Sequence, residues 1–237
     1  MKCVIFDIDG TLIDEAHRLE VQTDSVAKWF GDSLEEKQSV IDEFFAVNDR
    51  AQVLKNEGNS QFKNNIPWYM QEIGHKLGVK VSEEEAKIMA EKWSSAYDDS
   101  HENPQLFPDV VDVLHALREK GVKMLVASGN TEKTRKIILS QTGIEDYFEA
   151  IYTAIDIGFQ KQDVRFWQVV LREINYAPGE IVVVGNQIND DVVHPQFLGL
   201  TTVLVNRPGV LRKNLGPKDV APDYTINDLQ QLVEIVG

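Results

Sequence analysis

Residues 1–14 read MKCVIFDIDGTLID, and the fold is decided by the short apolar run 2–6 inside this stretch. A run of this length without polar alternation predicts a strand that is buried on both faces. It ends abruptly in two acids, Asp7 and Asp9. Two carboxylates one residue apart at the mouth of a buried strand repel each other unless a cation or a proton compensates, so the pair indicates a functional site.

Comparable apolar runs return along the chain and alternate with helical patterns. The predicted strands are 2–6, 122–128, 149–154, 180–185 and 201–205, and the predicted helices between them are 108–120, 131–141, 163–175 and 190–198. Strands that alternate with helices in this way favour right-handed crossovers and a parallel sheet covered on both faces. The sequence therefore predicts an α/β fold with a doubly wound parallel sheet.

The interval 15–104 departs from this alternation, because it contains several helical patterns and no convincing strand. We predict that residues 1–14 and 105–237 form an α/β core and that residues 15–104 form an inserted, mainly helical domain. Within the insert, the stretch SEEEA is typical of a helix start with Ser82 as the N-cap, since carboxylates in the first turn complement the helix dipole.

The bulk composition excludes several classes of protein. Of the 237 residues 43% are hydrophobic and 26% are charged, which is typical of a globular protein. The formal net charge of -14 opposes binding to nucleic acid or to an anionic membrane, so we expect neither partner. No apolar run is long enough to cross a bilayer, and the chain has a single cysteine, Cys3. We therefore expect a cytoplasmic location.

Polar residues follow four of the predicted strands, at the sheet edge where ligands bind in doubly wound folds. They are Asp7, Asp9, Gly10 and Thr11 after the first strand, Ser128, Gly129 and Asn130 after the second, Lys161 after the third, and Asn186, Asn189, Asp190 and Asp191 after the fourth.

This set suits the transfer of a phosphoryl group. One aspartate can attack phosphorus and form an acyl-phosphate, which water then hydrolyses. A second carboxylate two residues on can protonate the leaving oxygen and later deprotonate the water. A lysine and a serine hydroxyl can neutralise and orient the phosphate oxygens, and carboxylates can hold Mg²⁺, a hard cation that prefers oxygen ligands.

On these residues the chain resembles the haloacid dehalogenase (HAD) superfamily of hydrolases. DIDGT matches its first motif, D-x-D-G-T, and VASGN is similar to its second, an apolar strand that ends in Ser or Thr. Lys161 in GFQKQD stands at the lysine of the third motif, and VVVGNQINDDV is similar to the fourth. The resemblance covers the whole predicted core and implies a Rossmann-like core with an inserted C1-type cap.

The resemblance also implies a role for each motif residue. Asp7 is the expected nucleophile, Asp9 the expected acid/base, and Ser128 and Lys161 the expected phosphate contacts. Other expected substrate contacts are Thr11, Gly129 and Asn130. Apart from the motifs, Arg50 is a charged residue of the predicted cap that we expect to contact a second anionic group of the substrate. The expected Mg²⁺ ligands are Asp7, Asp9, Asn186 and Asp191, with Asp190 as the competing choice for the second acid of the fourth motif.

Two positions depart from the family pattern. Gln162 follows Lys161 where proline is common, which we expect to loosen the loop and to leave the ammonium in place. Asn186 stands where the family usually has an aspartate that touches the metal. An amide oxygen still binds a hard cation, but one negative charge is lost, so we expect a lower affinity for the metal.

We therefore predict a Mg²⁺-dependent hydrolase of small phosphate monoesters, which acts on an anionic phosphorylated metabolite and exists as a monomer or homodimer. Two alternatives stay open. The first is a metal-independent 2-haloacid dehalogenase, which the neutral Asn186 favours and Asp9 disfavours. The second is a catalytically weakened protein that keeps the fold as a binding module.

Overall fold

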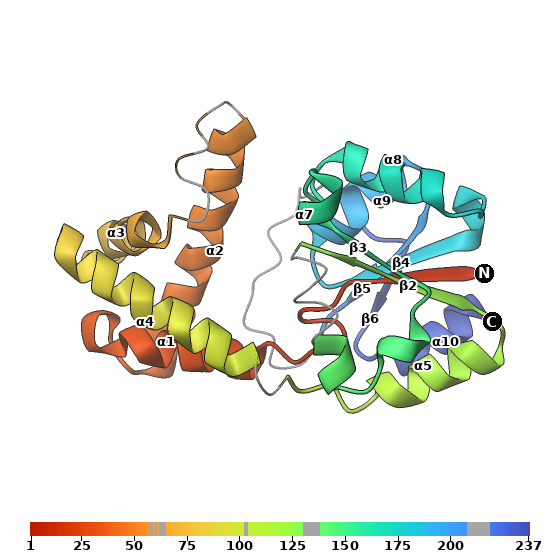
Figure 1. Ribbon diagram of the computed structural model, residues 1–237, viewed down its shortest axis with the longest axis horizontal. Helices are drawn as coiled ribbons and strands as arrows, with labels where there is room; N and C mark the ends of the chain where they lie inside the picture. Colours follow the sequence, from red (N-terminus) through yellow and green to blue (C-terminus); the bar gives the residue numbers. More distant parts are fainter. Residues whose placement is uncertain (57–58, 60, 62–64, 102–103, 130–137, 208–218) are drawn as a thin grey trace. The chain divides into compact units, whose positions relative to one another are not determined.

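The structure is a computed structural model, and it describes residues 1–56, 59, 61, 65–101, 104–129, 138–207 and 219–237 (Figure 1). The described chain divides into two compact units. One contains residues 1–15 and the described residues from 104 onwards, and the other contains residues 16–101. No described helix is both long and apolar enough to span a membrane.

The first unit is built on a six-stranded parallel sheet in the order β3-β2-β1-β4-β5-β6. The strands are β1 (Cys3–Phe6), β2 (Lys123–Ser128), β3 (Ala150–Thr153), β4 (Ile181–Gly185), β5 (Thr201–Val205) and β6 (Tyr224–Ile226). The predicted doubly wound α/β fold is confirmed. The short strand β6 was not predicted, because two of its three residues are exposed and it lacks the apolar run of the others.

Helices cover both faces of the sheet. They are α5 (Val110–Glu119), α7 (Ala154–Ile157), α8 (Val164–Glu173), α9 (Val193–Phe197) and α10 (Gln230–Val236). Figure 1 shows α5 and α10 on one face and α8 and α9 on the other. Most of the predicted helix 131–141 lies outside the described residues, and its described part, residues 138–141, is helical.

Alternate side chains of the strands β1, β2 and β4 enter two separate cores. In β1, Val4 and Phe6 pack against α5 and α10, whereas Cys3 and Ile5 pack against α8. All four side chains are fully buried. A strand buried on both faces needs apolar residues at every position, which explains the continuous runs in the sequence.

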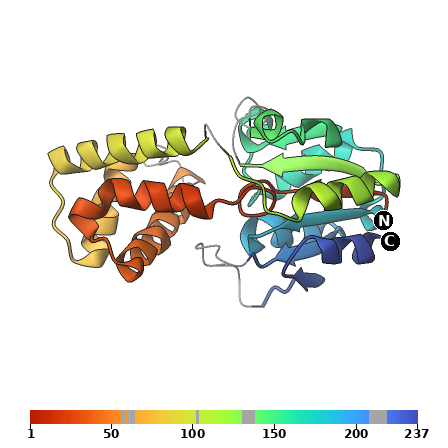
Figure 2. The same ribbon diagram turned by 90° about the horizontal axis from the view of Figure 1, so that it is seen from below.

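The second unit consists of helices inserted between β1 and β2. They are α1 (Ala16–Phe30), α2 (Leu34–Asn56), α3 (Ile66–Leu77) and α4 (Glu83–His101), and Figure 2 shows them as one bundle. Their core is rich in aromatic rings: Phe44 lies 4.7 Å from Trp93 and 5.6 Å from Tyr69 between ring centroids. Ser82 caps α4 as predicted, since its Oγ accepts the N–H of Glu85 at 3.3 Å and donates to the Glu85 carboxylate at 2.7 Å.

Candidate active site

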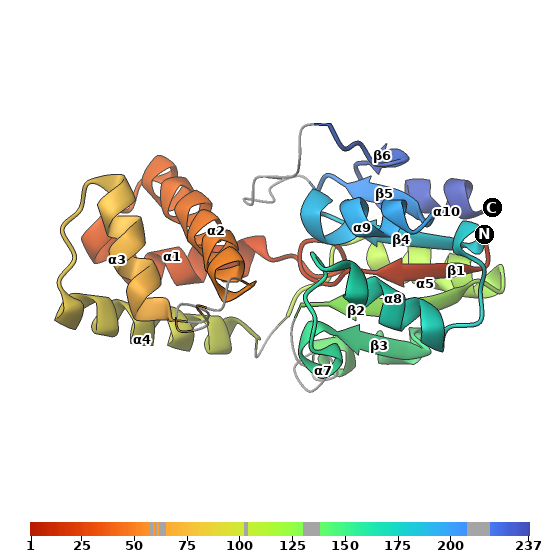
Figure 3. The same cartoon turned by 90° about the horizontal axis from the view of Figure 1, so that it is seen from above.

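The carboxyl ends of β1, β2 and β4 meet at one edge of the sheet, because β1 lies between the other two strands and all three are parallel. Phe6, the last residue of β1, is in register with Val126 and Val184. Asp7, the next residue, donates its N–H to the Val184 carbonyl at 2.9 Å. The predicted site residues that follow these strands therefore share one edge, which can be followed in Figure 3.

Lys161 joins these strand ends. Its ammonium Nζ lies 2.8 Å from Asp7 Oδ1 and 2.5 Å from Asp191 Oδ1, and it donates to the Ala127 carbonyl at 3.2 Å. The lysine side chain is only 3% exposed, so solvent ions screen these pairs weakly. In the sequence, Asp7 stands 154 positions before Lys161 and Asp191 stands 30 positions after it. The structure brings these three residues together.

The loop that carries Lys161 is fixed from several sides. The indole N–H of Trp167, a buried residue of α8, donates to the Lys161 carbonyl at 2.9 Å. Gln162, which replaces the family's usual proline, donates from Nε2 to Asp190 Oδ1 at 2.5 Å. His194 Nε2 lies 2.7 Å from the Gln162 carbonyl oxygen. The described contacts give no support to the expectation that Gln162 loosens this loop.

Thr11 braces the turn after β1. It is fully buried, and its hydroxyl donates to Asp7 Oδ2 at 3.3 Å. The N–H groups of Thr11 and Leu12 both donate to the Ile8 carbonyl, at 3.2 and 2.9 Å. One oxygen of Asp7 therefore contacts Lys161 and the other contacts Thr11, which fixes the orientation of the carboxylate.

Asn186 lies directly against the turn of the DIDGT segment. Gly10 has φ +75, and a Cβ added to it would stand 2.0 Å from Asn186 Nδ2 and 2.9 Å from Glu15 Oε1. Only glycine can occupy position 10, both for its left-handed backbone and for the space that the Asn186 amide fills. The ends of β1 and β4 therefore meet at Asn186, which is 7% exposed.

The two acids of the fourth motif have different surroundings. Asp191 is 1% exposed, contacts Lys161 through Oδ1, and accepts the Gln187 N–H at 3.0 Å through Oδ2. A Cβ on Gly185 would stand 2.0 Å from the Asp191 carboxyl carbon, so Asp191 packs on the glycine backbone. Asp190 is partly exposed and accepts from Gln162. Both acids belong to a π-helical turn, η4 (Ile188–Val192).

The other predicted substrate contacts lie in several parts of the chain. Ser128 is buried at the end of β2, and Gly129 follows it as an exposed residue. Asn130 lies outside the described residues. Arg50 is in α2 of the helical unit, where it pairs with Glu72 and lies over the Trp68 ring at 5.1 Å from its centroid. Its role as a substrate contact stays a prediction.

Carboxylates outnumber cations at these strand ends. Burial raises the pKa of Asp7, the Lys161 ammonium opposes that rise, and the charges of Asp9 and Asp190 add to it. Burial likewise raises the pKa of Asp191, to about 7, with Lys161 again opposing and Asp7 and Asp190 adding. Burial alone would lower the pKa of Lys161, but Asp191 and Asp7 reverse this and hold it above its ordinary value. Four acids thus act electrostatically around one ammonium.

This donor set fits a hydrated Mg²⁺ ion by its chemistry. Within the described part of the chain, no three His, Cys, Asp or Glu side chains cluster as a ready metal site. Mg²⁺ needs only one or two protein carboxylates and keeps several waters, so the carboxylates of Asp7 and Asp190 with the amide oxygen of Asn186 are sufficient donors. A divalent cation would also offset the excess negative charge.

Sequence reasoning missed Arg207 and Asp109, which lie next to this site. The Arg207 guanidinium donates to the Thr11 carbonyl from Nε at 3.2 Å and from Nη2 at 2.7 Å, and pairs with Asp109 Oδ2 at 2.6 Å. A lone arginine after an apolar strand is the only signal that the sequence gives for it.

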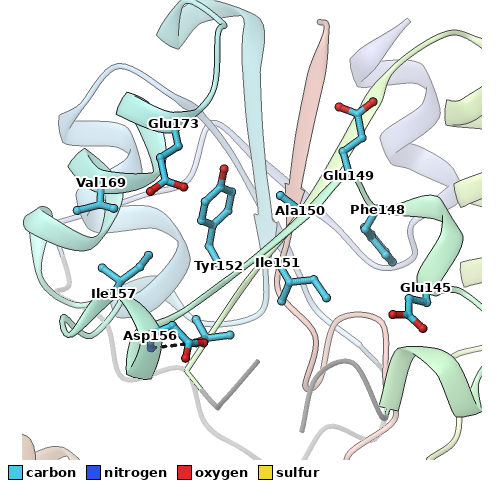
Figure 4. A pocket seen from close by; sticks show the side chains of 11 residues that line it. Glu145, Phe148, Glu149, Ala150, Ile151, Tyr152, Asp156, Ile157, Val169 and Glu173 are labelled. Atoms are coloured by element: carbon cyan, nitrogen blue, oxygen red, sulfur yellow. Dashed lines mark hydrogen bonds between the residues drawn. The ribbon is translucent and has the colours of Figure 1, made fainter. Parts of the chain in front are cut away.

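A separate cavity of about 640 Å³ lies along the edge strand β3 (Figure 4). Its polar lining is largely acidic, with the carboxylates of Glu145, Glu149, Asp156 and Glu173. None of the predicted catalytic residues is among the residues that line it. The chemistry-bearing residues therefore gather at the strand ends and not in this cavity.

The family of the chain follows from its overall sequence pattern. The sequence pattern of the family of haloacid dehalogenase-like hydrolases matches residues 1–193. The pattern of a second family, described as HAD-hydrolase-like, matches residues 160–232. The chain belongs to the haloacid dehalogenase-like hydrolases. The predicted family and the helical insertion between β1 and β2, in the manner of a C1 cap, are confirmed.

Several relatives and solved structures cover the full length of this HAD protein. The glyceraldehyde 3-phosphate phosphatase of Methanopyrus kandleri is 25% identical over 243 residues, which span 100% of this chain and 97% of the relative. The putative HAD-hydrolase YfnB from Bacillus subtilis bound to magnesium has a TM-score of 0.74 at 18% identity, covering 100% and 98% of the two chains. The L-2-haloacid dehalogenase from Xanthobacter autotrophicus has a TM-score of 0.68 at 16% identity, covering 100% and 98%. The fold is therefore shared with a HAD-hydrolase and with a dehalogenase, and the sequence is similar to that of a phosphatase.

Proposed function

We propose that this HAD protein is a Mg²⁺-dependent hydrolase of small phosphate monoesters that works through a phospho-aspartyl intermediate at Asp7. The observation that carries the proposal is the contact of Asp7 with Lys161 at the meeting point of three strand ends. The full-length relative named as a glyceraldehyde 3-phosphate phosphatase supports a small phosphorylated metabolite as substrate.

In the first step, a carboxylate oxygen of Asp7 attacks phosphorus while the bond from phosphorus to the ester oxygen breaks. Burial raises the pKa of Asp7, and the Lys161 ammonium opposes that rise and favours the ionised nucleophile. Asp9, two residues on, gives its proton to the leaving oxygen. Ser128 and Lys161 are proposed to contact the non-bridging phosphate oxygens.

In the second step, Asp9 takes a proton from water, the water oxygen attacks phosphorus, and inorganic phosphate leaves with Asp7 restored. Bound Mg²⁺ supplies positive charge that lets an anionic nucleophile approach an anionic ester. The side chains of Asp7, Asn186 and Asp190 are those we propose to hold it, and Asp9, whose carboxyl carries the proton in both steps, stays a predicted ligand. Asp191 remains a predicted ligand, although both of its oxygens already contact protein groups.

The helical unit is proposed to act as a cap that selects the substrate, with Arg50 as one contact for a second anionic group. A cytoplasmic location and a monomeric or homodimeric state remain predictions.

A metal-independent 2-haloacid dehalogenase is the second candidate, and the neutral Asn186 against Gly10 is the observation that favours it. Such an enzyme also uses an aspartate nucleophile. Asp9 and its acid/base role weigh against it, because the halide leaving group needs no proton.

One set of assays distinguishes the candidates. Phosphate release from a panel of small phosphate esters is measured with Mg²⁺ and with a chelator, for the wild type and for Asp7→Asn, beside halide release from a short 2-haloacid. We expect turnover that requires Mg²⁺ and disappears in the variant. Halide release that the chelator does not change would identify a dehalogenase. If no assay shows turnover, the remaining candidate is a binding module.

A further inference from the structure

Arg207 follows β5 and is buried beside the turn that carries the nucleophile. Its side chain is 3% exposed and is fixed on three sides. Two of its nitrogens donate to the Thr11 carbonyl, a third pairs with Asp109, and the guanidinium lies 4.2 Å from the centroid of the Phe107 ring. A planar guanidinium can serve a carbonyl, a carboxylate and an aromatic face at once, which an ammonium cannot.

Asp109 fixes the other side of the arginine. Its Oδ2 accepts both the Arg207 guanidinium and the Leu229 N–H, each at 2.6 Å. Its Oδ1 is buried and has no hydrogen-bond partner among the described residues. The carboxylate therefore depends on Arg207 for its charge balance, and the pair is anchored on both α5 and the start of α10.

The contact with Thr11 leads to the nucleophile in one step. The carbonyl of Thr11 is held by Arg207, and the hydroxyl of the same residue donates to Asp7 Oδ2 at 3.3 Å. The neighbouring segment closes the turn, because Phe107 donates its N–H to the Leu12 carbonyl at 3.0 Å. A shift of Thr11 would therefore move the hydroxyl that orients Asp7.

We propose that Arg207 is a positioning residue for the reaction, which acts on Asp7 through the carbonyl of Thr11. This inference rests on the proposed phosphatase function and adds a residue to it. A small misplacement of a reacting group costs far more in the chemical step than in substrate binding. Loss of the Arg207 contacts should therefore lower kcat with little change in KM.

The test must separate positioning from stability, because Arg207→Met alone leaves the charge of Asp109 buried and uncompensated. The double variant Arg207→Met/Asp109→Asn removes both charges and keeps an acceptor for the Leu229 N–H. Val113→Ala is the matched control, since Val113 is 1% exposed in α5 and its truncation destabilises the same core without touching Thr11. The measurements are kcat, KM, thermal unfolding, and amide hydrogen exchange of residues 8–13.

We expect the double variant to lose about tenfold to a hundredfold in kcat. Its KM should stay within about twofold of the wild type, with faster exchange of residues 8–13, whereas Val113→Ala keeps wild-type kcat well below its melting temperature. Unchanged kcat and unchanged exchange in the folded double variant would overturn the proposal, as would an equal loss of kcat in Val113→Ala. If the wild type hydrolyses no phosphate ester, the proposed function fails, and the exchange measurement alone decides whether Arg207 holds the turn.

Discussion

At the residue scale, Lys161 is the cation that opposes protonation of the nucleophile. Burial raises the pKa of the Asp7 carboxyl, and the ammonium 2.8 Å from Oδ1 lowers it. A carboxylate must be ionised to attack phosphorus, so activity is present above its pKa and lost below it. Lys161 therefore extends activity toward lower pH.

Replacement of this lysine should shift the pH dependence of the reaction. In Lys161→Met we expect the acid limb of the profile of kcat/KM against pH to move to higher pH, because the contribution that lowers the pKa of Asp7 is gone. Two buried carboxylates also lose their counter-ion, which should cost about 3–5 kcal/mol of unfolding free energy. Lys161→Arg keeps the charge and is the control. An acid limb that is the same in the wild type and in Lys161→Met would contradict the role given to Lys161.

A second residue-scale prediction concerns Asn186. Asn186→Asp preserves the shape of the side chain that fills the space against Gly10 and restores one negative charge. We expect Mg²⁺ to bind about tenfold more tightly, because affinity rises with the charge of the oxygen ligands. Calorimetric titration with MgCl₂ measures this. Unchanged or weaker affinity would remove Asn186 from the metal site.

Asp7, Asp9 and Lys161 could be selected from the sequence because the order of the parallel strands brings their loops to one edge whatever the details of the side chains. Which of Asp190 and Asp191 is buried could not be predicted from the sequence. Asp191 is buried and Asp190 is partly exposed within a π-helical turn, and the letters INDDV contain no signal for such a turn. Arg207 was missed for a related reason, since its partners Thr11 and Asp109 are distant in the sequence.

At the element scale, the junction of β4 with its π turn depends on Gly185. The space that a Cβ would need is filled by the Asp191 carboxyl carbon, 2.0 Å away, and Asp191 in turn contacts Lys161. The glycine of the fourth motif is therefore required by packing, although its backbone does not adopt the left-handed conformation.

We expect Gly185→Ala to lower the unfolding free energy by about 1–3 kcal/mol, since the added methyl group overpacks a buried site. Turnover should also fall, because Asp191 must move and Lys161 moves with it. Gly179→Ala is the matched control, as a Cβ at position 179 meets nothing within 4 Å. Denaturant unfolding and turnover of both variants check the prediction, and equal stability of the two variants would refute it.

The predictable elements are those whose pattern is long and buried. The central strands appear as continuous apolar runs because both of their faces enter cores. The edge strand β6 has a single buried residue among three, so no periodic signal marks it. Its place in the sheet is set by pairing with β5, and such pairing is a tertiary contact that a local pattern does not contain.

At the scale of the whole molecule, charge sets the conditions for the reaction. The chain carries a net charge of -14, and four carboxylates act on one another at the strand ends. An anionic substrate meets repulsion there unless local cations offset it, which is the role proposed for Lys161 and Mg²⁺. The same net charge underlies the prediction that nucleic acid and anionic membranes are not partners.

The central claim, a phosphoryl group carried by Asp7, is tested most directly in the variant Asp9→Asn. An aryl phosphate needs little help from a general acid to leave, whereas water needs a base to attack the acyl-phosphate, so the intermediate should accumulate. The measurement is acid quenching in the presence of Mg²⁺, followed by peptide mass spectrometry. We expect one phosphoryl group per protein on Asp7, and none in the double variant Asp7→Asn/Asp9→Asn. A phosphoryl group on any other residue, or product release without phosphorylated protein, would contradict the claim.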